Sequence, residues 1–134
     1  MSEYVEIVKR AMERNRIAYP HLDIQKDEKT LLNTVYREAW NLAIFIETLR
    51  EPSFFKNYLN VEGLPEEIHK ILREYVNGSI STEETVEKIK NFVSIIEIGA
   101  KKLGYIYDNE IGMFVRELKE KKKSRGFTLF NLFF

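Results

Sequence analysis

The residues with the clearest potential for chemistry are an acid and a histidine three positions apart. Glu66 and His69 form a Glu-x-x-His pattern, which on a helix places both side chains on one face, as the di-iron sites of helical bundles require. Such a site needs a second Glu-x-x-His and two further glutamates, and the only other histidine is His21. We therefore interpret Glu66 and Glu67 as a pair of surface acids at the start of a helix, next to an ordinary histidine, His69, and predict no metal site.

No other pattern in the chain points to catalysis. The sequence contains no cysteine, which excludes a thiol nucleophile and a zinc–thiolate site. It also lacks a Gly-x-Ser-x-Gly elbow and a glycine-rich loop for binding phosphate. We predict that the protein is not an enzyme and that it uses no cofactor.

Length and composition predict one small domain. The chain has 134 residues, in which 21 basic side chains balance 21 acidic ones, and a chain of this length buries roughly two thirds of its unfolded surface. No signal peptide is recognisable, and no apolar run approaches the roughly 20 residues that span a bilayer, so we expect a cytoplasmic protein. Glutamine occurs only as Gln25, whereas lysine and glutamate are abundant, a bias typical of thermophilic proteins.

Helical spacing of apolar residues predicts most of the architecture. We expect helices over residues 3–17, 27–50, 65–76 and 81–103. Two of them carry apolar seams, at 32–49 and 86–103, which we expect to pack antiparallel in the core. Residues 54–59 predict a short helical turn. Ser81 and Glu84 form a capping box at the start of the last of these helices.

Two predictions concern the middle of the second helix and the end of the body. Trp40, Ile44 and Phe45 widen the apolar stripe of the second helix until its middle is apolar almost all round, which is typical of a central, buried helix. Asp108 predicts the cap of a further helix that extends to Leu118. No alternation of period two persists long enough to predict a sheet.

The predicted fold class is therefore all-α: a compact bundle of four to five helices with a C-terminal apolar tail. Residues 1–118 form the helical bundle domain, and residues 119–134 form a basic hinge and a hydrophobic docking tail. Within this segment, residues 119–125 hold five basic side chains and one acidic one, and residues 127–134 hold four phenylalanines and two leucines. Because exposed apolar surface of this kind invites association, we expect the tail to be buried against its own domain, a partner or a membrane surface.

The tail has a period of three. Phenylalanines recur at positions 127, 130 and 133 and leucines at 129 and 132, and three residues make one turn of a 3₁₀ helix. These residues resemble the PIP box, the peptide by which replication and repair proteins bind the PCNA sliding clamp. Its pattern is glutamine-x-x-aliphatic-x-x-aromatic-aromatic, and Thr128-Leu129 is similar to the Thr-Leu pair common in archaeal clients.

The resemblance leaves two registers open. In the first, Leu129 is the aliphatic plug, and Leu132 and Phe133 take the paired positions. In the second, Phe130 is the plug and is followed by the aromatic pair Phe133-Phe134; in neither register is the glutamine of the motif present. The resemblance implies a partner-binding set of Phe127, Leu129, Phe130, Leu132, Phe133 and Phe134. The basic residues expected to steer the tail toward an acidic surface are Lys119, Lys121, Lys122, Lys123 and Arg125.

The function implied by the resemblance is that of a non-enzymatic helical adaptor, whose partner is the sliding clamp of DNA replication and repair. The main alternative is a structural accessory subunit, cellular or viral, of a nucleoprotein assembly or homodimer, in which the tail completes its own core. A peripheral membrane anchor is a third interpretation. Nucleic-acid binding is expected to be weak, because acids dilute the arginines of residues 3–17 and no aromatics interleave the basic residues of 119–125.

Overall fold

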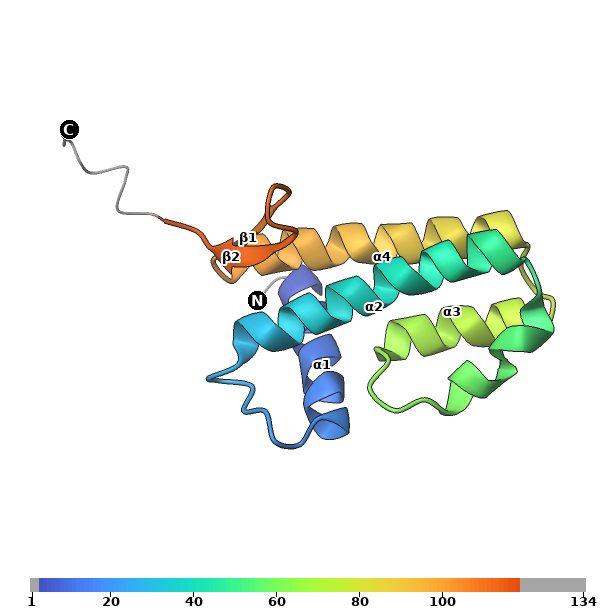
Figure 1. Cartoon of the computed structure of the whole chain (residues 1–134), viewed down its shortest axis with the longest axis horizontal. Coiled ribbons are helices and arrows are strands. Elements are labelled where there is room, and N and C mark those ends of the chain that lie inside the picture. The colour runs from blue at the N-terminus through green and yellow to red at the C-terminus, as the bar shows by residue number, and fades with distance from the viewer. Residues whose placement is uncertain (1–2, 119–134) are drawn as a thin grey trace.

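The protein is a helical bundle with one small β-hairpin (Figure 1). The computed structural model describes residues 3–118, so the predictions made for the basic run and the tail lie outside the described residues. In chain order the elements are α1 (Glu3–Ala18), α2 (Glu28–Leu49), the 3₁₀ helix η1 (Pro52–Asn60), α3 (Glu66–Val76), α4 (Thr82–Lys102), β1 (Tyr105–Asp108) and β2 (Met113–Arg116). The predicted helical bundle is confirmed, including the short helical turn that becomes η1.

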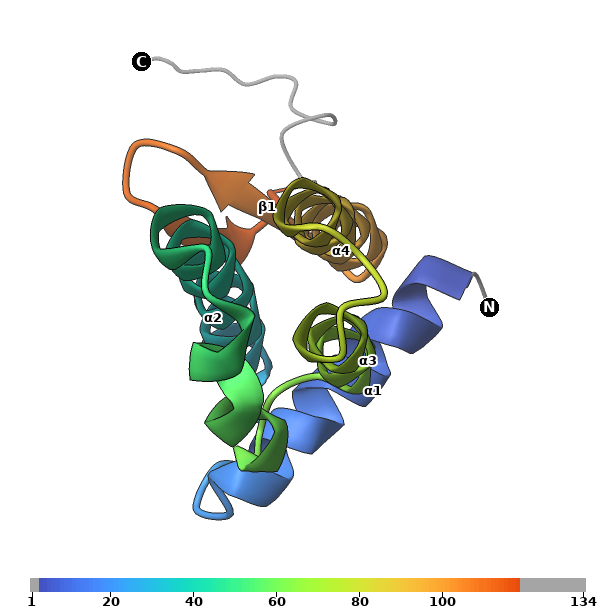
Figure 2. The same cartoon turned by 90° about the vertical axis from the view of Figure 1, so that its right-hand side faces the viewer.

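The two helices with apolar seams form the centre of the bundle. α2 and α4 lie side by side and run in opposite directions (Figure 1), and Figure 2 shows α1 and α3 on one side of this pair with the hairpin on the other. Val35 and Ile46 of α2 and Ile89 and Ile96 of α4 are fully buried. The predicted capping box is present at the start of α4. The antiparallel core predicted from the seams is therefore confirmed.

The crossing of α1 over α4 depends on a glycine. A Cβ atom placed on Gly99 would lie 2.4 Å from Cγ2 of Val8 and 2.6 Å from the carbonyl oxygen of Tyr4. Carbon atoms in contact normally lie about 3.5–4.0 Å apart, so no side chain fits between the two helices at this point. Gly99 therefore sets how closely α1 approaches α4.

The predicted helix from Asp108 to Leu118 is wrong, and so is the expectation that the chain forms no sheet. Residues 105–108 and 113–116 pair as antiparallel strands, with Tyr107 opposite Phe114. Oδ1 of Asp108 accepts the backbone N–H of Glu110 at 2.9 Å, a bond that here begins an Asx turn. Gly112 has a φ of +72°, which favours glycine and lets the chain turn into β2.

The hairpin closes one side of the core. The backbone N–H of Phe114 donates to Oδ1 of Asn33 at 2.7 Å, and Nδ2 of Asn33 donates to the carbonyl of Lys29 at 3.0 Å. The ring of Phe114 is fully buried and lies edge-on against Tyr36, with the ring centres 4.9 Å apart. The C-terminal end of the described chain is thus tied to the first half of α2.

The middle of α2 is not buried all round, which corrects the prediction made from its composition. Ile44 is 55% exposed and Phe45 is 44% exposed, and Leu49, the last residue of the predicted seam, is 42% exposed. α1 and α3 cover one side of the α2–α4 pair, and the hairpin covers the other side only near the start of α2 (Figure 1). The second half of α2 therefore keeps an apolar face open to solvent.

Candidate functional site

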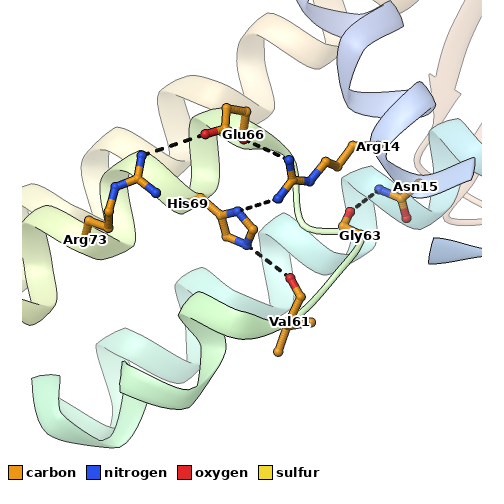
Figure 3. A network of polar contacts seen from close by, with 7 residues as sticks. All are labelled: Arg14, Asn15, Val61, Gly63, Glu66, His69 and Arg73. Atoms are coloured by element: carbon orange, nitrogen blue, oxygen red, sulfur yellow. Dashed lines mark hydrogen bonds and ion pairs between the residues drawn. The ribbon is translucent and has the colours of Figure 1, made fainter. Parts of the chain in front are cut away.

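The Glu-x-x-His pair lies on α3 and reaches toward α1 (Figure 3). Oε1 of Glu66 accepts from Nη1 of Arg14 at 2.9 Å, and its Oε2 lies 3.8 Å from Nη2 of Arg73. The neighbouring Glu67 accepts from Nη2 of Arg10 at 2.7 Å. Both glutamates at the start of α3 therefore pair with arginines of α1 across the helix interface.

His69 is buried between the same two helices and is neutral at the geometry observed. Nη2 of Arg14 lies 3.0 Å from Nδ1 of His69, and because a guanidinium group only donates hydrogen bonds, Nδ1 must accept. The proton of the ring is then on Nε2, which donates to the carbonyl of Val61 at 3.1 Å. Burial lowers the pKa of His69, and the nearby positive charge of Arg14 lowers it further.

The polar cluster around His69 acts as a structural tie. Asn15 is fully buried on α1, and its Nδ2 donates to the carbonyl of Gly63 at 2.6 Å (Figure 3). Together with His69 and Val61, this contact fastens the loop between η1 and α3. Within residues 3–118, no three histidine, aspartate or glutamate side chains are placed to hold a metal ion. The side chains of Glu66 and His69 thus contact arginines and a backbone carbonyl.

We expect the lowered pKa of His69 to make stability fall with acidification. The unfolded chain takes up a proton near the ordinary histidine pKa of 6.5, whereas the folded chain resists protonation until a lower pH. The stabilisation from neutral His69 is therefore complete above about pH 6.5 and is lost as pH falls through the lowered pKa. Urea unfolding between about pH 8 and pH 5 should show a steeper loss for the wild type than for His69→Gln.

His21→Gln is the matched control for this measurement, because His21 is exposed. Its dependence of the unfolding free energy on pH should follow that of the wild type. Burial raises the pKa of Glu38, so this residue makes the unfolding free energy rise as pH falls. The contribution is the same in all three proteins and cancels when their pH dependences are compared. Equal slopes for wild type and His69→Gln would contradict the neutral, buried His69.

The arginines of α1 are neutralised by neighbouring acids. Arg10 and Arg14 pair with glutamates of α3 as described, and Arg16 pairs with Glu13 one turn earlier on α1. A guanidinium group that already pairs with a carboxylate has less positive charge to offer a phosphate.

An apolar groove lies between α2 and η1. It has a volume of about 230 Å³. Its lining residues are Glu38, Asn41, Leu42, Phe45, Tyr58, Val61 and Leu64. Phe54 continues the apolar surface beside it, because its ring packs edge-on against that of Phe45 at 5.9 Å between centres. Phe54 is 45% exposed, so the surface around the groove is aromatic and open.

One carboxylate in this groove has an unpaired oxygen. Oε2 of Glu38 accepts from the hydroxyl of Tyr19 at 3.5 Å, whereas Oε1 of Glu38 is buried and has no hydrogen-bond partner among the described residues. Burial raises the pKa of Glu38, an effect that Tyr19 and Arg37 partly oppose. A buried acceptor without a partner is costly, so Glu38 is a strained, acidic residue in the lining of the groove.

The sequence patterns do not predict this groove. They place Phe45 in a buried helix and Phe54 and Tyr58 in a short helical turn. The pattern available was a phenylalanine on the outer face of α2 followed by an aromatic-rich turn. Only the packing of η1 against α2 places these residues beside Glu38.

The residues predicted to bind a partner, in the tail, and those predicted to steer it, in the basic run, lie outside the described residues. Their assignment stays a prediction. None of the helices between residues 3 and 118 combines the length and apolar character needed to cross a membrane. Comparison with family models, curated proteins and solved structures finds no match to this chain.

Proposed function

We propose that the protein is a non-enzymatic helical adaptor that docks on a protein partner through residues 127–134. The observation that carries this proposal is the composition of the core. Each element between α1 and β2 contributes a buried apolar side chain, from Val8 in α1 to Phe114 in β2. Because these residues pack among themselves, the phenylalanines and leucines of the tail are free to serve a different surface.

The tail resembles a ligand of the PCNA sliding clamp. Binding to this clamp would link the bundle to DNA replication or repair. Leu129 or Phe130 would fill the central pocket of the partner. Leu132 with Phe133, or Phe133 with Phe134, would fill its aromatic pocket. The five basic residues of 119–125 would increase the rate of association with an acidic surface. The resemblance to the PIP box supports this choice of partner.

Deletion of residues 127–134 tests the proposal. Buried aromatic anchors contribute about 2–4 kcal/mol each to an interface, so loss of the phenylalanines should weaken clamp binding by more than about 100-fold in titration calorimetry. The far-ultraviolet circular dichroism and the melting temperature should stay close to those of the full chain. A matched control is Asn131→Ala, which keeps every apolar residue of the tail and should retain binding.

Two results would contradict this proposal. A full chain that does not bind the clamp would remove the proposed partner. A sharp fall in melting temperature, or insoluble protein after the deletion, would instead favour the interpretation that the tail completes the core.

The exposed face of α2 favours one second candidate, a structural subunit that forms a homodimer or joins a nucleoprotein assembly. Ile44, Phe45 and Leu49 are all more than two fifths exposed, and exposed apolar surface often marks an interface. Sedimentation across a range of concentrations, with the wild type and with Ile44→Glu, would test it. A wild-type dimer that dissociates in the variant would support this candidate. A wild-type protein that is monomeric at every concentration and does not bind nucleic acid at low salt would count against it.

A further inference from the structure

The groove between α2 and η1 has the size and lining to accept an aromatic side chain of a peptide. Its volume of about 230 Å³ is below the roughly 300–1,000 Å³ typical of pockets for small molecules. Phe45 and Tyr58 stand on its walls, and aromatic pairs prefer edge-to-face or offset contacts of the kind that such walls allow. The geometry therefore favours a peptide carrying phenylalanine over a free metabolite.

The charge in the groove indicates which kind of peptide would bind there. Among the described residues, Glu38 is the one acidic residue that lines the groove, and its carboxylate favours a peptide that carries lysine or arginine. The segment 119–134 carries five basic residues immediately before four phenylalanines. Its composition therefore matches both properties of the groove, an apolar wall and an acidic residue.

The C-terminal segment is also long enough to reach this groove. At the end of the hairpin, Nη2 of Arg116 lies 3.9 Å from Oε1 of Glu28 at the start of α2. Phe45 follows Glu28 by 17 positions, which is about 25 Å along the helix at 1.5 Å per residue. Ten extended residues span about 33 Å, so Phe127 and the residues after it can reach the groove and pass around α2, which is about 10 Å wide.

We propose that the groove between α2 and η1 is the docking site of the chain's own C-terminal segment, with the phenylalanines of 127–134 on Phe45 and Tyr58 and a donor of the same segment on Glu38. This proposal differs from the interpretation in which the tail completes the core. The groove lies on the surface, and the described residues already fill the core beneath it. It extends the proposed function by giving the tail a position when no partner is bound.

Covalent attachment is what makes the chain's own tail the preferred occupant. Because the tail is covalently tethered, its binding to the groove is intramolecular, with an effective concentration set by the length of chain between the hairpin and the tail. The tail of a second copy, or an unrelated peptide, has to reach that effective concentration free in solution to compete. A partner then has to displace the tail, and a tail docked nine tenths of the time lowers the apparent affinity of the partner by about tenfold.

The absence of cysteine allows a direct test on the full chain. A nitroxide spin label on Asn131→Cys should broaden the methyl signals of Leu42, Val61 and Leu64, which line the groove, in a methyl-resolved NMR spectrum. The methyl signals of Ile95, which lies in the surface depression between α3 and α4, serve as the reference. Phe45→Asp should restore the groove signals.

Further variants keep the test valid if Phe45→Asp disturbs the fold. Val61→Asp changes a 42% exposed side chain on the rim of the groove and should release the tail in the same way. Glu38→Gln keeps the shape of the groove and removes its charge, so it should reduce the broadening. Circular dichroism of each variant checks that the bundle is intact.

Broadening at the groove that is no greater than at Ile95 would overturn the proposal. Equal broadening in a mixture of spin-labelled chains and separate, isotope-labelled chains would show that the groove binds the tail of a second copy, and would also overturn it. The experiment contains no partner protein. Its failure therefore leaves the sliding-clamp proposal standing, and a failure of clamp binding leaves the docking site standing.

Discussion

Replacement of Phe114 by alanine is expected to lower the free energy of unfolding by about 3–5 kcal/mol. The ring of Phe114 is fully buried and contacts Tyr36 and Tyr107, with ring centres 4.9 and 5.2 Å apart. Its removal leaves a cavity where the hairpin covers α2. Because a domain is typically stable by only about 5–15 kcal/mol, urea denaturation should show the midpoint shifted to much lower urea.

Ile111→Ala is the matched control in the same hairpin. Ile111 lies in the turn and is 58% exposed, so its truncation should change the unfolding free energy by less than about 0.5 kcal/mol. A small effect of Phe114→Ala, comparable with that of Ile111→Ala, would show that the hairpin is not part of the core.

Replacement of Gly99 by alanine is expected to destabilise the protein by about 2 kcal/mol. In a helix, alanine is more favourable than glycine by about 1 kcal/mol. At an exposed position this difference would be the main effect of the substitution. At Gly99 the new methyl group would meet the backbone carbonyl of Tyr4 at 2.6 Å. Backbone cannot rotate away as a side chain can, so α1 has to shift, at a cost near the upper end of the about 1–3 kcal/mol seen for overpacked cores.

Ser94→Ala on the same helix separates the two effects. Ser94 is exposed, so alanine there should leave stability unchanged or raise it by a few tenths of a kcal/mol. Chemical denaturation of both variants gives the comparison. A Gly99→Ala protein as stable as Ser94→Ala would mean that α1 and α4 are farther apart than described.

Local signals in the sequence were sufficient to predict most of the helical bundle. The capping box of Ser81 and Glu84 acts within four residues, and the seams of α2 and α4 depend only on the spacing of apolar residues. Gly99 carries no such signal, because its neighbour Tyr4 lies 95 positions away in the chain. A glycine inside a predicted helix shows only that the helix is weakened, and not which element passes over it.

The error at the hairpin has a local cause. An aspartate that caps a helix and an aspartate that begins an Asx turn both accept backbone N–H groups two or three residues later, and Asp108 does so from Glu110 and Ile111. The hairpin is favoured over a helix by Asn33, a residue distant in the chain, whose side-chain oxygen accepts the backbone N–H of Phe114. The groove escaped prediction for a similar reason, since Glu38 and Val61 meet only when η1 folds back along α2.

The hydrogen bond between Asn33 and Phe114 has a consequence for folding during synthesis. It joins residues 81 positions apart, and ribosomes add about 5–20 residues per second. The ring of Tyr36 and the first half of α2 are therefore made several seconds before the hairpin that covers them. During that interval Tyr36 lacks the contact with Phe114 that it makes in the folded protein, so α2 can complete its packing only after nearly the whole described chain has been made.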